Sequence, residues 1–204
     1  MRIARTLGWI ALVTVCVVIG AWVALLVFAR DAPQSVHAAG APVQHEAIAL
    51  PPARASRRGL LAVPVAGVAR EALRDNWGDP RDNGQRLHHG TDILAPAGTL
   101  VTAAAPGTIE KLWQSAAGGT TLYVRSPARD WTYYYAHLSG YALGVHAGQE
   151  VRAGDPLGYV GDTGNAGTGN FHLHFGMTRT TPDQYWYQGE DVDPFPYLSG
   201  KTGG

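Results

Sequence analysis

The sequence is poor in residues that would cross-link a small domain or give it a basic surface. It has a single cysteine, Cys16, so no disulfide can form within the chain. Lysine plus arginine and aspartate plus glutamate both total 16, and the formal net charge is zero. A balanced charge gives no support for nucleic acid as a partner, which favours a basic surface. We therefore expect the domain to depend for its stability on its core and on any metal it binds.

Charged residues are also absent from a long apolar run near the N-terminus, from Thr6 to Ala29. As a helix this run would span about 36 Å, enough to cross a bilayer core of about 30 Å. Arg2 and Arg5 precede it, which predicts a cytoplasmic N-terminus and a periplasmic or extracellular C-terminal domain. The alternative is a signal peptide cleaved near Ala38, but the apolar region of such peptides spans only about 7 to 15 residues. We interpret residues 1–30 as a cytoplasmic tip and a single transmembrane signal anchor.

The rest of the chain divides by composition into two parts. Residues 31–59 are rich in alanine and proline without apolar periodicity, which predicts a flexible linker. From Leu60 onward, short apolar runs of strand length alternate with glycine, proline and aspartate. Only residues 69–76 are compatible with a short helix. Strands without intervening helices pair antiparallel, so residues 60–204 are predicted to form an all-β domain.

A weak internal repeat refines this prediction. The pattern A-G-x-x-V-x-A occurs at residues 97–103 and again at 147–153, each time followed by a glycine-bearing turn and another strand. Two copies of one strand-turn-strand unit suggest a compact antiparallel β-sandwich or barrel-like fold built from a duplicated hairpin. The pattern is also similar to the hairpins of biotinyl and lipoyl carrier domains. Those domains present a lysine at a hairpin tip, and neither Lys111 nor Lys201 lies in a suitable turn.

Histidines provide the first indication of chemistry. His172 and His174 lie in a stretch that alternates like a strand, so their side chains should share one face. Two neutral imidazoles side by side suit a metal, or one ligand and one base. His137, in the stretch Tyr-Ala-His-Leu, is a third candidate.

A second pattern pairs a histidine with a carboxylate. His88 and Asp92 are separated by three residues, and the glycine and threonine between them allow a bend that brings the two side chains together. Two imidazole nitrogens and one carboxylate oxygen form a ligand set suited to zinc, with a fourth position open to water. His89 adjoins His88 and is the alternative ligand if the loop is shifted by one residue, although the spacing to Asp92 favours His88.

In combination these patterns resemble a known family, the lysostaphin/LytM-type zinc metallopeptidases, which are endopeptidases of peptidoglycan. Four blocks occur in the family's order: RLHHGTDILAPAGTLVTAAAPGTI, YYYAHLSG, VRAGDPLGYVGDTGNAG and HLHFG. They extend over about residues 76–177 and are together highly specific. The resemblance implies a compact antiparallel β fold with a substrate groove over a Zn²⁺ ion. The residues that it assigns as zinc ligands are His88, Asp92 and His174. The residues that it assigns as catalytic are His137 and His172.

The function implied is that of a zinc-dependent endopeptidase, hydrolysing amide bonds in the peptide stems or cross-links of bacterial peptidoglycan. One of His137 and His172 would take a proton from water while the other supports the oxyanion. The alternative is a non-catalytic wall-binding module that activates another wall hydrolase, as in family members that have lost zinc ligands. All five expected positions are filled here, which favours the enzyme. The sequence identifies no regulatory partner. Aromatic residues that could line the groove are Trp77, Trp113, Trp131, Tyr133, Tyr134 and Tyr185.

Overall fold

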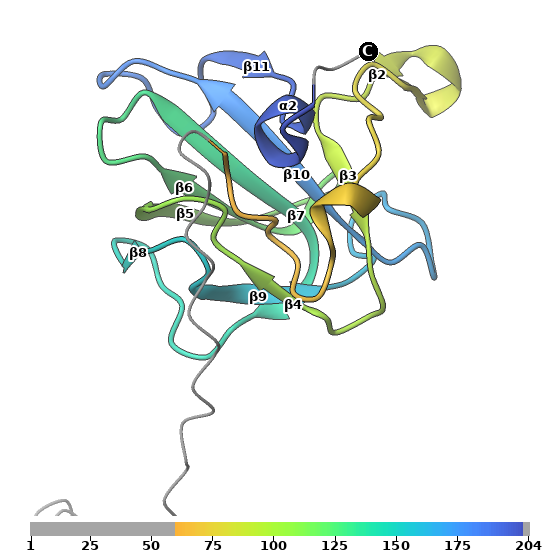
Figure 1. Ribbon diagram of the computed structural model, residues 1–204, viewed down its shortest axis with the longest axis horizontal. Helices are drawn as coiled ribbons and strands as arrows, with labels where there is room; N and C mark the ends of the chain where they lie inside the picture. The colour runs from red at the N-terminus through yellow and green to blue at the C-terminus, as the bar shows by residue number, and fades with distance from the viewer. Residues whose placement is uncertain (1–59, 202–204) are drawn as a thin grey trace, which may run out of the picture. The chain divides into compact units, whose positions relative to one another are not determined.

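Strands dominate residues 60–201, the part of the chain that this computed structural model describes (Figure 1). The strands are β1 (Pro80–Arg81), β2 (Arg86–Leu87), β3 (Thr91–Leu94), β4 (Leu100–Thr102), β5 (Gly107–Ser115), β6 (Gly119–Arg125), β7 (Trp131–Tyr141), β8 (Glu150–Val151), β9 (Pro156–Val160), β10 (His172–Arg179) and β11 (Glu190–Val192). The helical elements are the 3-10 turns η1 (Arg70–Ala72) and η2 (Asp82–Gly84) and the helix α2 (Phe195–Ser199). The predicted all-β class is confirmed.

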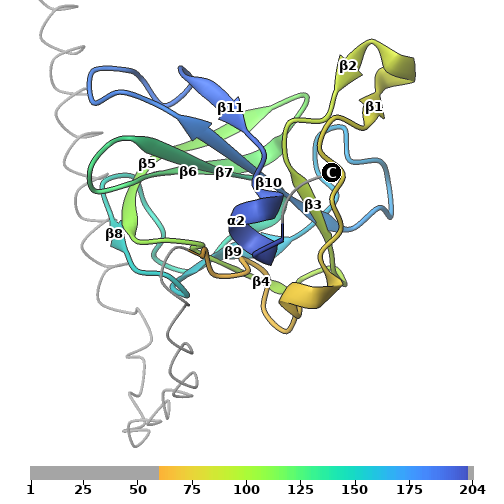
Figure 2. The same cartoon turned by 45° about the horizontal axis from the view of Figure 1, so that its top comes forward.

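Nine strands form one antiparallel sheet, and β1 and β2 form a separate two-stranded ladder. The order along the main sheet is β11-β10-β7-β6-β5-β8, with β3 beside β10 and β9 joining β4 to β7. Strand β7 connects the two parts, because it pairs with β10 and β6 along its first half and with β9 at residues 138–141. Figure 2 shows β4 and β9 set below the plane of β5, β6, β7 and β10. The expected sandwich or barrel is therefore one continuous curled sheet, because β7 runs unbroken through the curl.

The two copies of the internal repeat occupy equivalent places in this sheet. Each copy makes a tight turn at a glycine with positive φ, Gly98 at 76° and Gly148 at 85°, and then enters β4 or β8. The Gly98 N–H donates to the carbonyl of Val160, and the Gly148 N–H donates to that of Ile109. Strand β4 thus pairs with β9, which follows the second copy, while β8 pairs with β5, which follows the first. The short strand of each copy therefore pairs with the strand that follows the other copy.

The core lies on one face of the sheet, and the period of the strands explains this. Along β10, Leu173, Phe175 and Met177 join the hydrophobic core, whereas His172 and His174 point to the opposite face. One face of β10 therefore packs in the hydrophobic core, and the opposite face is available for a functional site.

Helical structure differs from the sequence-based expectation. The helix expected at residues 69–76 is only the single turn η1, in which no residue is buried. Helix α2 was not predicted, although its sequence has proline in the first turn, at Pro196, and a terminal glycine, Gly200, with φ of 72°. It contributes Phe195 and Leu198 to the core.

The predicted transmembrane anchor and linker fall in residues 1–59, outside the described residues. Within residues 60–201, no helix is long and apolar enough to cross a membrane.

Candidate metal centre

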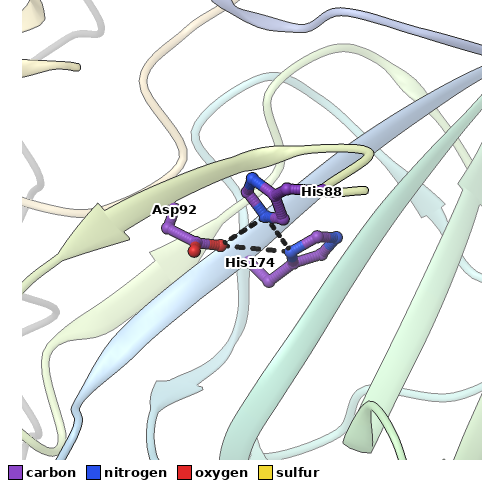
Figure 3. A group of neighbouring side chains, drawn as sticks. All are labelled: His88, Asp92 and His174. Atoms are coloured by element: carbon purple, nitrogen blue, oxygen red, sulfur yellow. Dashed lines mark hydrogen bonds and ion pairs between the residues drawn. The ribbon is translucent and has the colours of Figure 1, made fainter. Parts of the chain in front are cut away.

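Three side chains from two distant parts of the sequence converge where β3 pairs with β10 (Figure 3). His88 precedes β3, Asp92 lies on β3, and His174 lies on β10. Nε2 of His88 is 2.9 Å from Oδ1 of Asp92 and 2.9 Å from Nδ1 of His174. Nδ1 of His174 is 3.1 Å from the same Asp92 oxygen. The three candidate ligands predicted from the sequence are thus brought together.

Strand register and a glycine produce this convergence. Strands β3 and β10 are antiparallel, and Asp92 is the direct cross-strand partner of His174. The imidazole of His174 lies against Gly90, where an added Cβ would come within 2.6 Å of Cε1 of the ring. Any larger residue at position 90 would displace the His174 ring, so glycine is required there by close packing.

Hydrogen bonds behind the cluster orient its ligand atoms. Nδ1 of His88 donates to the carbonyl of Asn76 over 2.7 Å, so the neutral ring keeps a lone pair on Nε2. The side-chain oxygen of Asn76 also accepts the backbone N–H of Asp92. Arg81 donates to Oδ2 of Asp92 over 2.7 Å. The other oxygen, Oδ1, is left to face the two histidines.

Burial and hydrogen bonding set the charges of the cluster. Burial alone would raise the pKa of Asp92, but hydrogen bonds and charge interactions with His174 and His88 outweigh it and hold this pKa well below its ordinary value. Burial lowers the pKa of His174 despite its hydrogen bond to Asp92. At neutral pH the cluster therefore combines a carboxylate with a neutral imidazole, the forms in which both bind metals.

The donor set fits a zinc ion. A carboxylate oxygen and two imidazole nitrogens are directed at one point, the arrangement in which such side chains can hold a metal ion. Tetrahedral zinc, with ligand distances of about 2.0–2.1 Å, holds its ligand atoms about 3.3–3.4 Å apart. The separations of 2.9–3.1 Å lie within a few tenths of an ångström of that spacing.

Two further histidines face the cluster. The ring centroids of His137 and His172 are 4.8 Å apart, and Nε2 of His172 lies 3.8 Å from Oδ1 of Asp92. Nδ1 of His137 donates to the carbonyl of Thr163, and Nδ1 of His172 donates to that of Asn170, each over 2.8 Å. In their neutral forms both rings therefore present an unprotonated Nε2.

His137 reaches this position through a bulge in β7. Thr120 pairs with Leu138 but Leu122 pairs with Tyr135, so two residues of β7 lie opposite one residue of β6. His137 is in the bulge with φ of 61°, a conformation that histidine adopts only at a cost. Burial lowers the pKa of His137 to about 4, so the ring is neutral at neutral pH. Backbone strain at a side chain aimed into the site is typical of a functional residue.

A groove with a cavity volume of about 440 Å³ runs over the cluster. Besides the five predicted residues, its walls include Arg81, Arg86, Gly118, Tyr134, Asn165 and Asn170. Of the aromatic residues suggested by the sequence, Tyr134 lines this groove, whereas Tyr133 is buried in the core.

His89 is turned away from the cluster. Its side chain is 52% exposed, its Nδ1 lies 2.9 Å from Oδ2 of Asp191, and its ring stacks on Trp77. The geometry therefore excludes His89 as a ligand in place of His88. Sequence reasoning missed Arg81 and Asn76, because nothing in their local sequence indicates contact with the site. It identified Gly90 as a bend but not as the residue against which the His174 ring packs.

Comparison with known proteins agrees with this geometry. The chain matches the model of Peptidase family M23 over residues 86–194, and it belongs to that family of peptidases. It is 36% identical over 133 residues to an L-Ala–D-Glu endopeptidase of Bacillus subtilis, covering 62% of this chain and 39% of that protein. It is 36% identical over 90 residues to the peptidoglycan DD-endopeptidase ShyC of Vibrio cholerae, covering 44% of this chain and 20% of that one. The chain thus spans less than half the length of these curated relatives.

A solved structure supports the same assignment. The catalytic domain of the antimicrobial peptidase lysostaphin from Staphylococcus simulans superposes with a TM-score of 0.52 at 28% identity. The match covers 62% of this chain and 90% of that domain. The similarity to the lysostaphin/LytM-type family predicted from the four sequence blocks is therefore confirmed.

Proposed function

We propose that the protein is a zinc-dependent endopeptidase that hydrolyses amide bonds in the peptide part of bacterial peptidoglycan. The observation on which this rests is the arrangement of five side chains in one groove. His88, Asp92 and His174 would hold the zinc ion, and His137 and His172 stand beside them with Nε2 directed inward. One relative is named a peptidoglycan DD-endopeptidase and another an L-Ala–D-Glu endopeptidase, and these names support peptidoglycan peptides as the substrate.

Zinc, when bound, supplies Lewis-acid activation of water and of the scissile carbonyl. The surrounding residues keep its ligands in their binding forms. Arg81 holds Oδ2 of Asp92 and so directs Oδ1 toward the centre, and the Asn76 carbonyl keeps the proton of His88 on Nδ1. Gly90 leaves the space in which the His174 ring lies.

His137 and His172 would carry the proton. A neutral Nε2 beside the groove can accept the proton of the attacking water and return it to the nitrogen of the leaving amine. The second ring would take a proton from solvent onto its Nε2 as negative charge develops, and the resulting N–H can donate to the oxyanion of the tetrahedral intermediate. The backbone carbonyls of Thr163 and Asn170 hold both rings in the required tautomer.

Peptide release by the purified full chain tests this proposal. Isolated peptidoglycan incubated with the zinc-loaded protein should yield peptide fragments that are identified by mass, and a chelator should stop their release. Added zinc should restore it, because the Lewis acid is then replaced. The glycan strands should stay intact, since of the two carboxylates that line the groove Asp92 would be bound to zinc and Asp82 is paired with Arg86, which leaves no acid and nucleophile for glycoside cleavage.

The competing function is regulatory. If the zinc-loaded protein bound wall material and released nothing, yet stimulated a separate wall hydrolase, the non-catalytic module would replace the enzyme. Release of sugar fragments instead of peptides would contradict both functions.

We further propose that residues 6–29 anchor the chain in the membrane, with the domain outside the cytoplasm. The basis is the charge asymmetry about that apolar run, with Arg2 and Arg5 before it. A reporter fused after Gly204 should be exposed to the periplasm or the outer face of the membrane, and the protein should stay with the membrane fraction after a salt wash. A shortened soluble form cut near Ala38 would instead establish a cleaved signal peptide.

A further inference from the structure

Six aromatic side chains form a continuous row that begins in the groove, and we name this row the aromatic strip. Its members are Tyr134, Tyr123, Trp186, Trp113, Tyr187 and Tyr185. Ring centroids of Tyr134 and His174 are 5.8 Å apart, which places the inner end of the strip against a candidate zinc ligand. Tyr134 and Tyr123 stack at 4.6 Å, and Tyr123 contacts Trp186 at 4.5 Å.

Beyond Trp186 the strip divides and reaches the surface. Trp186 contacts Trp113 at 5.9 Å and Tyr187 at 5.2 Å, and Tyr187 stacks on Tyr185 with an interplanar angle of 4°. The outer rings are accessible: Trp113 is 45% exposed, Tyr185 63% and Tyr187 64%.

The register of the sheet places the inner part of the strip on the face that carries the metal centre. Tyr123 pairs with Tyr134, and Tyr134 pairs with Gly176, two residues from His174 on β10. Trp113 pairs with Thr121, which shares the face of Tyr123. The strip therefore continues the groove along the same side of β5, β6 and β7.

The loop that carries Tyr185, Trp186 and Tyr187, residues 180–189 between β10 and β11, is held in place by a buried arginine. Arg125 is only 2% exposed. Its guanidinium donates to Oε2 of Glu110, to Oγ1 of Thr180 and to the carbonyl of Gln184. Such an anchor holds the loop in place before any ligand arrives, which reduces the entropy that binding must overcome.

We propose that the aromatic strip binds the glycan strand of peptidoglycan while the groove holds the attached peptide; this inference rests on the proposed function for the choice of polymer. Sugar rings present C–H faces that pack on aromatic faces and hydroxyl groups that bond at ring edges. Tyrosine and tryptophan offer both kinds of contact. Because stem peptides branch from the glycan, a surface that continues the groove is where the strand lies when a peptide occupies the site.

Charge favours this occupant over an anionic polymer. Lys111, which lies 5.2 Å over the Trp113 ring, is the only cation that stacks on a ring of the strip within residues 60–201. A nucleic acid would require several cations along its path. The glycan strand needs none, because its recognition depends on ring faces and hydroxyl groups.

Binding of peptide-free glycan strands tests the inference; the strands are prepared by removing the stem peptides from peptidoglycan and amidating the carboxyl groups thereby freed, so that the polymer stays uncharged. The zinc-loaded full chain is used throughout, and binding is measured by isothermal titration calorimetry without any requirement for turnover. Trp113→Ala and Tyr187→Ala should each weaken binding by about tenfold, the loss typical of an aromatic anchor. Tyr187→Phe keeps the ring face and should retain most of the binding. Tyr159→Ala, at an exposed tyrosine on β9 outside the strip, should bind like the unaltered protein.

A comparison of two substrates separates the strip from the groove. Strip variants should release peptides more slowly from intact peptidoglycan and at an unchanged rate from sugar-free cross-linked peptides. Unchanged glycan binding in Trp113→Ala and Tyr187→Ala would overturn the inference. An equal loss of rate on both substrates would do the same, because the strip would then contact the peptide. A change of oligomeric state in the variants would identify a second copy of the chain as the occupant. If no peptide is released but glycan binding still depends on the strip, the proposed peptidase function fails and the glycan inference stands.

Discussion

Replacing His88, Asp92 or His174 by alanine is expected to remove zinc from the protein and to abolish peptide release. Each change takes away one of only three protein ligands, and the remaining two would bind zinc at least about 100-fold more weakly. Zinc content of the purified variants, measured by elemental analysis after dialysis, gives the result directly. Peptide release should fall to the level of the chelated protein.

The matched control is His89→Ala. This histidine is adjacent to His88 in the sequence, but it is half exposed and turned toward Asp191, so the variant should keep its zinc and its activity. Loss of zinc in His89→Ala with retention in His88→Ala would move the first ligand by one residue. Loss of zinc in His172→Ala with retention in His174→Ala would show that the two residues of the His-x-His pair have been assigned in the wrong order.

Replacing His137 by asparagine should leave zinc and folding intact while lowering turnover by about 100-fold or more. Only the ring of His137 reaches the cluster. Its replacement removes a group that can carry the proton and leaves all three zinc ligands in place. Asparagine tolerates the left-handed backbone at φ of 61° better than histidine does. The midpoint of thermal unfolding should therefore be no lower than that of the unaltered protein.

A stable, zinc-loaded and inactive His137→Asn variant would show that the strain in the β7 bulge serves function and not stability. Retained turnover would exclude His137 from the mechanism. Loss of zinc together with turnover would make it a ligand instead. His172→Ala is the companion variant, and it should also keep zinc and lose turnover.

Much of the site could be predicted from the sequence because its signals are local. Alternation along residues 171–175 is sufficient to place His172 and His174 on one face of a strand, and the structure has both on one face of β10. A glycine between His88 and Asp92 indicated a bend there. The absence of long periodic runs after residue 60 was sufficient to predict strands, because each apolar segment is too short for an ordinary helix.

Other predictions were only partly met, for identifiable reasons. The sandwich or barrel was inferred from the repeat, but the repeat fixes only two turns and two short strands. Whether they close a separate layer depends on β7, which continues through the curl and pairs with β6, β10 and β9. Within residues 69–76 only Leu73 is buried, which is too little apolar surface to stabilise a helix, and the stretch is reduced to one turn.

The sequence by itself determined the strand-rich class, the family and the five histidine and aspartate positions, since each depends on residue types at short spacing. The tertiary structure alone decided how those positions meet. Asp92 and His174 are 82 residues apart and become partners through the register of β3 and β10, and His137 enters the site through a bulge that no local pattern marks. Arg81 and Arg125 act through partners 11 and up to 59 residues away. Contacts at such separations are set by the pairing of whole strands, which depends on the packing of the entire core and not on the identity of any neighbouring residue.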